Sequence, residues 1–176
     1  MSNRQKDNSY GPFLFDNCEE LLTLFSNIYK EIDISSLGTF KEEQSKEASF
    51  RDDPGPFALK ECLQLEYELV QTYQTLGNSF KINGNFLMQR LSFLTTENNQ
   101  IQFQAIRHIS VFILDNDREY EIDKIVQKNK HLLLSFIEEF QLRDGEVDQF
   151  SDLKTVLLDK LNELQKKQIP VNRETL

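Results

Sequence analysis

Apolar residues recur three and four positions apart along most of this 176-residue chain, the spacing that places side chains on one face of an α-helix. The first such series runs from Asp16 to Ile32, where Asp16 and Glu19 form the capping-box pattern of a helix start. The same periodicity predicts six more helices. Their approximate ranges are 56–76, 85–94, 100–114, 118–128, 130–140 and 147–164.

Three features of these helices carry specific expectations. Gly77 follows the 56–76 helix and is expected to end it in the C′ position, where glycine is favoured. Asn129 is expected to separate the 118–128 helix from the 130–140 helix, because its side chain can cap the helix that follows. The 100–114 helix is apolar on more than one side, so we expect it to lie centrally in the core.

The stretch from Ser35 to Gly55 has a different character. It is rich in charged residues, has few apolar ones, and ends in the sequence Asp-Asp-Pro-Gly-Pro. Such a segment cannot bury a continuous apolar face. We therefore predict an N-terminal helix within 1–34, an acidic flexible linker at 35–55 and a helical domain at 56–176.

Composition and charge narrow the possible functions. Only 6 Gly and 4 Pro argue against a turn-rich β fold. A net charge of −9 disfavours nucleic acids and anionic lipid surfaces as partners. No apolar run approaches the roughly 18 residues that a membrane span requires. The two cysteines, Cys18 and Cys62, lie in helical patterns and form no disulfide framework, so we expect the cytoplasm or another reducing intracellular compartment.

The chain lacks the sequence patterns of common catalytic and metal sites. It has no Gly-x-Ser-x-Gly turn, phosphate-binding glycine loop or His-Glu-x-x-His pair, so we expect no enzyme activity, catalytic residue or cofactor. An EF-hand loop starting at Asp115 would fail at Tyr120 and Val126, which favours helix capping by Asp115 over calcium binding. His108 and His131 have no metal-ligand neighbours at zinc-like spacing, so we expect packing or surface positions and no metal.

Antiparallel helices of these lengths fit either a bundle or stacked repeats, and periodicity does not separate the two. The order of residues between about Asn85 and Leu164 distinguishes these two architectures. The segments concerned are 99–105, 111–112, 128–129, 134–141 and 148–155. Together they resemble the C-terminal part of the mouse protein 25 family, also called calcium-binding protein 39. The resemblance implies an all-α, armadillo/HEAT-like, right-handed helical-repeat solenoid, here a short one, so that 56–176 would be a helical-repeat domain.

The resemblance also implies a function and a site. The family consists of non-catalytic scaffolds that stabilise the active conformation of sterile-20-type kinases and related pseudokinases. In the family a C-terminal apolar pocket receives a short pseudokinase tail. Lys60 stands where the family has an arginine beside this pocket, Leu91 at a methionine and Met88 at a lysine. The resemblance thus makes Lys60, Met88 and Leu91 the candidate partner-binding residues.

Two functions remain open at this point. The chain is either a structural subunit of a larger assembly or an adaptor that binds and stabilises a sterile-20-type kinase or pseudokinase. The family's N-terminal repeats have no counterpart here, which favours the structural subunit. A shortened solenoid needs its exposed end covered, and the helix between Asp16 and Ile32 is the expected cap.

Overall fold

The computed structural model describes residues 18–31, 55–142 and 147–166, and within these ranges the chain is helical, with no strand. The helices are α2 (Cys18–Glu31), α3 (Gly55–Thr72), α4 (Gln74–Lys81), α5 (Gly84–Phe93), α6 (Asn99–Ile113), α7 (Tyr120–Glu139) and α8 (Val147–Lys166). The prediction of an all-α fold is confirmed. None of these described helices combines the length and the apolar character needed to cross a lipid bilayer.

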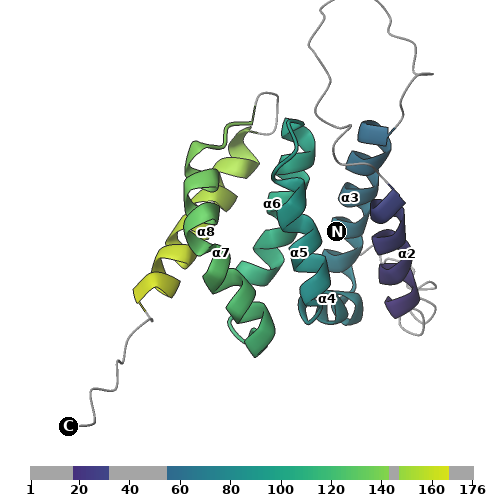
Figure 1. Ribbon diagram of the computed structural model, residues 1–176, viewed down its shortest axis with the longest axis horizontal. Coiled ribbons are helices and arrows are strands. Elements are labelled where there is room, and N and C mark those ends of the chain that lie inside the picture. The colour runs from purple at the N-terminus through teal and green to yellow at the C-terminus, as the bar shows by residue number, and fades with distance from the viewer. Residues whose placement is uncertain (1–17, 32–54, 143–146, 167–176) are drawn as a thin grey trace, which may run out of the picture.

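The helices are stacked side by side in one direction (Figure 1). Helices α2 and α3 lie at one end and α7 and α8 at the other. Helix α6 lies between them, packing against α3 and α5 on one side and contacting α8 on the other. Each helix therefore buries its apolar face against its neighbours in the stack.

Helix α6 is the centre of the core, as its apolar pattern predicts. Eleven of its fifteen residues are buried, and Phe112 has no exposed surface at all. The Phe112 ring packs against Phe80 of α4, with 5.0 Å between the ring centroids. Burying an aromatic side chain of this size is among the larger single contributions to a core.

The predicted 56–76 helix is wrong at its end. It divides at Tyr73, where the backbone is extended, into α3 and α4. Gly77 does not end a helix but lies buried inside α4. A Cβ atom at Gly77 would lie 2.8 Å from the carbonyl oxygen of Val70, closer than such atoms approach. Glycine is therefore required here because α4 crosses directly over the last turn of α3.

The predicted break at Asn129 is also wrong, because α7 continues through it. The side-chain amide of Asn129 donates a hydrogen bond of 2.8 Å to the carbonyl oxygen of Ile125, one turn earlier. It therefore bonds within its own helix instead of capping a new one. The two helices expected at 118–128 and 130–140 are one helix of twenty residues.

Asparagine does cap two other helices. The side chain of Asn83 accepts the backbone N–H of Asn85 at the start of α5. Asn98 accepts the N–H groups of Gln100 and Ile101 at the start of α6. Both satisfy backbone donors that a helix start leaves unpaired. The expected cap at Asp16 and, apart from Gly55, the expected linker at 35–55 lie outside the described residues.

Candidate functional site

The three candidate partner-binding residues lie on two helices. Lys60 lies on α3, and its ammonium nitrogen is 3.3 Å from a carboxylate oxygen of Glu61. Met88 and Leu91 are one turn apart on α5. The Met88 side chain is exposed, whereas Leu91 is half-buried against the main core. The structure thus brings Met88 and Leu91 together, while Lys60 is paired on its own helix.

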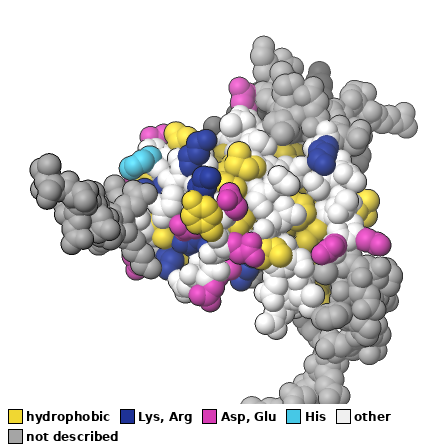
Figure 2. Space-filling view, turned by 60° about the horizontal axis from the view of Figure 1, so that its bottom comes forward, with side chains coloured by type: hydrophobic (Ala, Val, Ile, Leu, Met, Phe, Trp, Pro, Cys, Tyr) yellow, Lys and Arg dark blue, Asp and Glu magenta, His cyan; other side chains and the backbone are white. Residues whose placement is uncertain are grey.

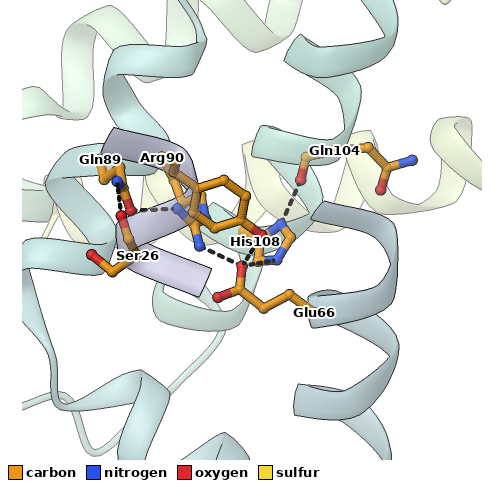
Figure 3. Close-up of polar contacts among 7 residues, drawn as sticks. Ser26, Glu66, Gln89, Arg90, Gln104 and His108 are labelled. Atoms are coloured by element: carbon orange, nitrogen blue, oxygen red, sulfur yellow. Dashed lines mark hydrogen bonds and ion pairs between the residues drawn. The ribbon is translucent and has the colours of Figure 1, made fainter. Parts of the chain in front are cut away.

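A group of polar side chains, not anticipated from the sequence, lies inside the stack. Its members are Tyr29 of α2, Glu66 of α3, Arg90 of α5 and His108 of α6, here called the buried polar cluster (Figure 3). Each has at most 1% of its surface exposed. One oxygen of Glu66, Oε2, accepts hydrogen bonds from Arg90 Nη2 and, at 3.1 Å, from the Tyr29 hydroxyl. His108 Nε2 lies 3.1 Å from the same oxygen.

Further contacts fix the orientation of Arg90 and connect α5 to α2. The Arg90 guanidinium lies over the Tyr29 ring, 4.4 Å from its centroid, a cation–π geometry. Arg90 Nη1 donates to Gln89 Oε1 at 2.8 Å, and Gln89 Nε2 donates at 3.4 Å to the backbone carbonyl of Ser26. Figure 3 shows Ser26 of α2 facing Gln89, which is next to Arg90 on α5. The polar contacts therefore join α2 to the repeat stack.

The protonation states follow from burial and from the partners. Burial disfavours ionisation of Glu66, but the Arg90 charge and the contact with His108 outweigh it and hold the pKa of Glu66 below 4.5. Burial lowers the pKa of His108 below 6.5, against the opposing effect of Glu66. His108 Nδ1 lies 2.9 Å from the carbonyl oxygen of Gln104 and Nε2 lies 3.1 Å from Glu66 Oε2; both oxygens are acceptors, so a neutral imidazole can donate to only one of them. Burial and the Glu66 charge raise the pKa of Tyr29.

This arrangement is suited to holding helices together. Glu66 and Arg90 form an ion pair without solvent contact, and removing one partner of such a pair typically costs about 3–5 kcal/mol because the other charge stays buried alone. No member of the cluster is open to a substrate while α2 is docked. The cluster therefore has a structural role: one carboxylate oxygen of α3 accepts hydrogen bonds from α2 and α5 and contacts α6.

The sequence does contain an indication of this cluster, namely charged or polar residues in phase with apolar stripes, which the search for apolar periodicity does not use. Glu66 continues the core-facing series formed by Leu59, Leu63 and Val70 on α3. Arg90 and His108 occupy the same kind of position on α5 and α6, and both are buried. A charged residue in phase with a buried stripe needs a partner. Three such residues on three helices therefore point to a shared network. Of the two positions expected for His108, packing and helix surface, its burial agrees with packing.

Two hollows open elsewhere on the described surface. One of about 440 Å³ lies between α2 and the α4–α5 turn and is lined in part by Thr23, Ile82 and Asn83. The other, of about 370 Å³, lies beside the α6–α7 turn and includes Lys81, Asp115 and Leu153. Lys60, Met88 and Leu91 line neither of them.

The acidic run at the α6–α7 turn does not cap α7, contrary to expectation. Asp115 Oδ1 accepts the backbone N–H of Asp117 at 3.0 Å, and its other oxygen lies 3.7 Å from the Lys81 ammonium. The N-cap of α7 is Glu119, whose side chain makes no capping hydrogen bond. Among the described residues, no three His, Cys, Asp or Glu side chains are grouped so as to hold a metal ion.

Comparison with known proteins identifies the family. The model of the Mo25-like family matches residues 68–165, which is more than half of the chain. The chain belongs to the Mo25-like family. The resemblance inferred from the sequence is confirmed, and so is the helical-repeat solenoid, because the matched segment contains α4 to α7 and nearly all of α8.

Individual Mo25-like relatives are distant. Calcium-binding protein 39-like from Mus musculus and its Homo sapiens counterpart are each 23% identical over 177 residues, covering 82% of this chain and 52% of the relative. Conidiophore development protein hymA from Emericella nidulans is 23% identical over 122 residues, covering 58% of this chain and 32% of the relative. The chain thus spans about half the length of the calcium-binding protein 39-like relatives.

Proposed function

We propose that this Mo25-like chain is a non-catalytic, protein-binding scaffold that serves as a structural subunit of a larger assembly. Membership of the Mo25-like family supports a helical scaffold with protein partners in general. The observation that carries the proposal is that the charged cluster is buried while several apolar side chains are exposed. The charged cluster is enclosed among four helices, whereas large apolar side chains such as Leu65 and Met88 are about half exposed on α3 and α5.

The accessible surface is of a kind that suits binding. Figure 2 shows apolar side chains lying among charged ones of both signs on one face of the described molecule. Isolated apolar side chains are ordinary on any protein surface, whereas Met88 and Leu91 lie one turn apart and form an adjacent pair. A methionine offers an adaptable contact, and Lys60 offers a positive charge. Together they would suit an apolar segment ending in a carboxylate.

The alternative partner is a sterile-20-type kinase or pseudokinase. It is supported by the positional match of Lys60, Met88 and Leu91 to the family's peptide pocket. A lysine in place of arginine replaces a two-pronged guanidinium contact with a single ammonium, which would weaken binding of a kinase tail. We therefore place the structural subunit first. The proposed location is the cytoplasm or another reducing compartment, where the half-buried thiol of Cys62 would stay free.

Purification of the tagged full-length chain from native lysate tests both functions. Non-kinase components recovered in constant proportion would support the structural subunit, whereas a sterile-20-type kinase would support the adaptor. The double variant Lys60→Glu with Leu91→Asp should lose partner recovery. Because Leu91 is half-buried, Lys60→Glu with the exposed Met88→Asp repeats the test with less risk to folding.

A matched control is available on α7, where Lys128 and Leu132 are both exposed. Lys128→Glu with Leu132→Asp introduces the same charge changes away from the candidate residues. We expect this control to retain its partners. Equal recovery with the α3–α5 variants and with the α7 control would exclude Lys60, Met88 and Leu91 from partner binding.

A further inference from the structure

The hollow of about 370 Å³ beside the α6–α7 turn follows α6 and is here called the α6 groove. Helix α3 lies on one side of α6 and α8 on the other (Figure 1). Phe103 of α6 meets Phe150 of α8 edge to face, with 5.7 Å between the ring centroids. The apolar side chains that line the groove are Tyr67 of α3, Val111 and Leu114 of α6, and Leu153 of α8. The groove therefore offers apolar surface from three helices.

Arg107 of α6 lies beside the α6 groove, against one of its lining residues. The guanidinium carbon of Arg107 is 4.1 Å from the centroid of the Tyr67 ring and 5.8 Å from that of Phe103. Its Nη1 donates a hydrogen bond of 3.0 Å to the side-chain oxygen of Gln104. Among the described residues, no Asp or Glu lies within ion-pair distance of Arg107. A guanidinium has five N–H donors, so most of those of this half-buried side chain remain for another acceptor.

The contacts of Arg107 orient its charge without neutralising it. The cation–π contact with Tyr67 and the hydrogen bond to Gln104 both come from uncharged groups. Acidic residues outnumber basic ones by 29 to 20 in this chain, yet the described residues supply no carboxylate here. A planar guanidinium binds a carboxylate through two parallel hydrogen bonds. Arg107 is therefore suited to a carboxylate of another molecule.

The other end of the α6 groove is acidic. Asp115 and Asp117 line it there, together with Lys81, whose ammonium lies 3.7 Å from Asp115 and offsets that charge. Asp117 is exposed, and no Lys or Arg of the described chain forms an ion pair with it. At 1.5 Å per residue, the positions of Arg107 and Asp115 are about 12 Å apart along the helix. An extended segment, rising about 3.3 Å per residue, covers this distance in three to four residues.

We propose that the α6 groove binds an extended segment of a partner protein. An acidic side chain of that segment pairs with Arg107, and a basic side chain about three residues away pairs with Asp117. The apolar side chains between them contact Val111 and Leu153. A nucleic acid is a poorer match, because Asp117 and the net charge of −9 repel phosphates. This inference rests on the proposed protein-binding function, and it adds a surface that the candidate residues of α3 and α5 do not line.

Nuclear magnetic resonance on the isotope-labelled, full-length chain tests the groove. The probe is a capped peptide in which leucine and valine separate a glutamate from a lysine, with glycines at both ends. We expect the amide signals of Ser110, Val111 and Leu114, which line the groove, to shift as peptide is added. The signal of His131, exposed on α7, should stay in place.

Charge reversal identifies the pairing. Arg107→Glu should weaken binding of this peptide by about ten-fold, because it places a carboxylate against the peptide glutamate. A second peptide, with lysine in place of the glutamate, should bind Arg107→Glu more tightly than it binds the wild type. Arg107→Gln removes the charge without reversing it, and it repeats the first comparison if Arg107→Glu does not fold.

Lys124→Glu is the matched control. Lys124 also lies over a tyrosine ring, 5.9 Å from the centroid of Tyr120, but on α7 and outside the groove. We expect this control to bind the first peptide as the wild type does. Equal weakening by Arg107→Glu and Lys124→Glu would overturn the proposal, and so would unmoved groove signals at peptide concentrations up to about 5 mM.

The same variants, purified from native lysate, separate this inference from the proposed function. Partners recovered with wild type and Lys124→Glu, but reduced with Arg107→Glu, would support both when joined to the peptide result. Equal recovery with all three proteins would exclude the α6 groove from partner binding and leave the scaffold function standing. A wild-type chain that recovers no partner would contradict the scaffold function itself, whatever the peptide titration shows for the groove.

Discussion

At the residue scale, the carboxylate of Glu66 accepts hydrogen bonds from Tyr29 of α2 and Arg90 of α5, and it also contacts His108 of α6. Isolated charges are expensive to bury, and Arg90 makes burial of this one tolerable by pairing with it. Three buried atoms in the cluster, Glu66 Oε1, Arg90 Nε and His108 Nε2, have no hydrogen-bond partner among the described residues. The cluster is therefore sensitive to any change in its protonation.

The pH dependence of folding should reflect this sensitivity. The folded-state pKa of His108 lies below its ordinary value of 6.5, and that of Glu66 lies below 4.5. Through both windows the unfolded chain binds more protons than the folded one, so the free energy of unfolding decreases as pH falls. The loss begins near pH 6.5, when His108 of the unfolded chain starts to take up a proton, and it deepens below pH 4.5.

The variant His108→Gln isolates the first step, because it removes the imidazole and leaves Glu66 and Arg90 in place. We expect wild-type protein to lose more of its urea resistance than the variant as pH falls from about 7 to about 5. Other carboxylates titrate alike in both proteins and cancel in the comparison. The same slope with pH in both proteins would mean that His108 is not buried in its neutral form.

The sequence could have indicated that these polar residues occupy buried positions, but not which of them pair with one another. Each lies in phase with a buried stripe, which marks it as anomalous. Which residue pairs with which depends on how the helices cross. Glu66 and Arg90 are 24 positions apart, and Tyr29 and Glu66 are 37 apart. Contacts over such separations arise from tertiary packing, which periodicity does not encode.

At the scale of elements, periodicity located the helices well and their breaks poorly. The 100–114 pattern corresponds to α6, and the asparagines before α5 and α6 cap them. The helix ends predicted at Gly77 and Asn129 were wrong because glycine and asparagine each have two roles in helices. Glycine can end a helix or permit a close crossing, and asparagine can cap a helix or bond within it. The choice depends on a neighbouring helix that the local sequence does not contain.

Replacing Gly77 tests the close crossing of α3 and α4. Alanine normally stabilises a helix interior relative to glycine by about 0.5–1 kcal/mol. Here the added Cβ would meet the Val70 carbonyl at 2.8 Å, so we expect Gly77→Ala to destabilise by about 1–3 kcal/mol in a urea titration.

Gly84→Ala is the matched control for Gly77. Its Cβ would meet the end of the Ile125 side chain at 3.2 Å, and that side chain can shift. We expect a smaller loss at Gly84 than at Gly77. Stabilisation by Gly77→Ala would show that α4 does not cross α3 as closely as described.

At the scale of the whole molecule, the fold is a Mo25-like stack whose first described helix, α2, packs on α3 and α4. Its Leu22 joins the main core, and its Phe25 and Tyr29 belong to a second apolar cluster. The prediction that this helix would cover part of the stack agrees with its docking through Phe25 and Tyr29. Family membership was accessible from the segments between Asn85 and Leu164. The polar contacts that hold α2 could not be predicted in this way, because they involve residues of α3 and α5 that lie outside those segments.

The mass and composition of the native complex test the central claim most directly. The chain alone weighs 20.7 kDa. Mass photometry of tagged protein released from native lysate, with its components identified, should give a complex several times heavier that contains non-kinase proteins in fixed ratio. A mass of one or two copies with no second protein, or a complex with only a kinase, would contradict the structural-subunit account.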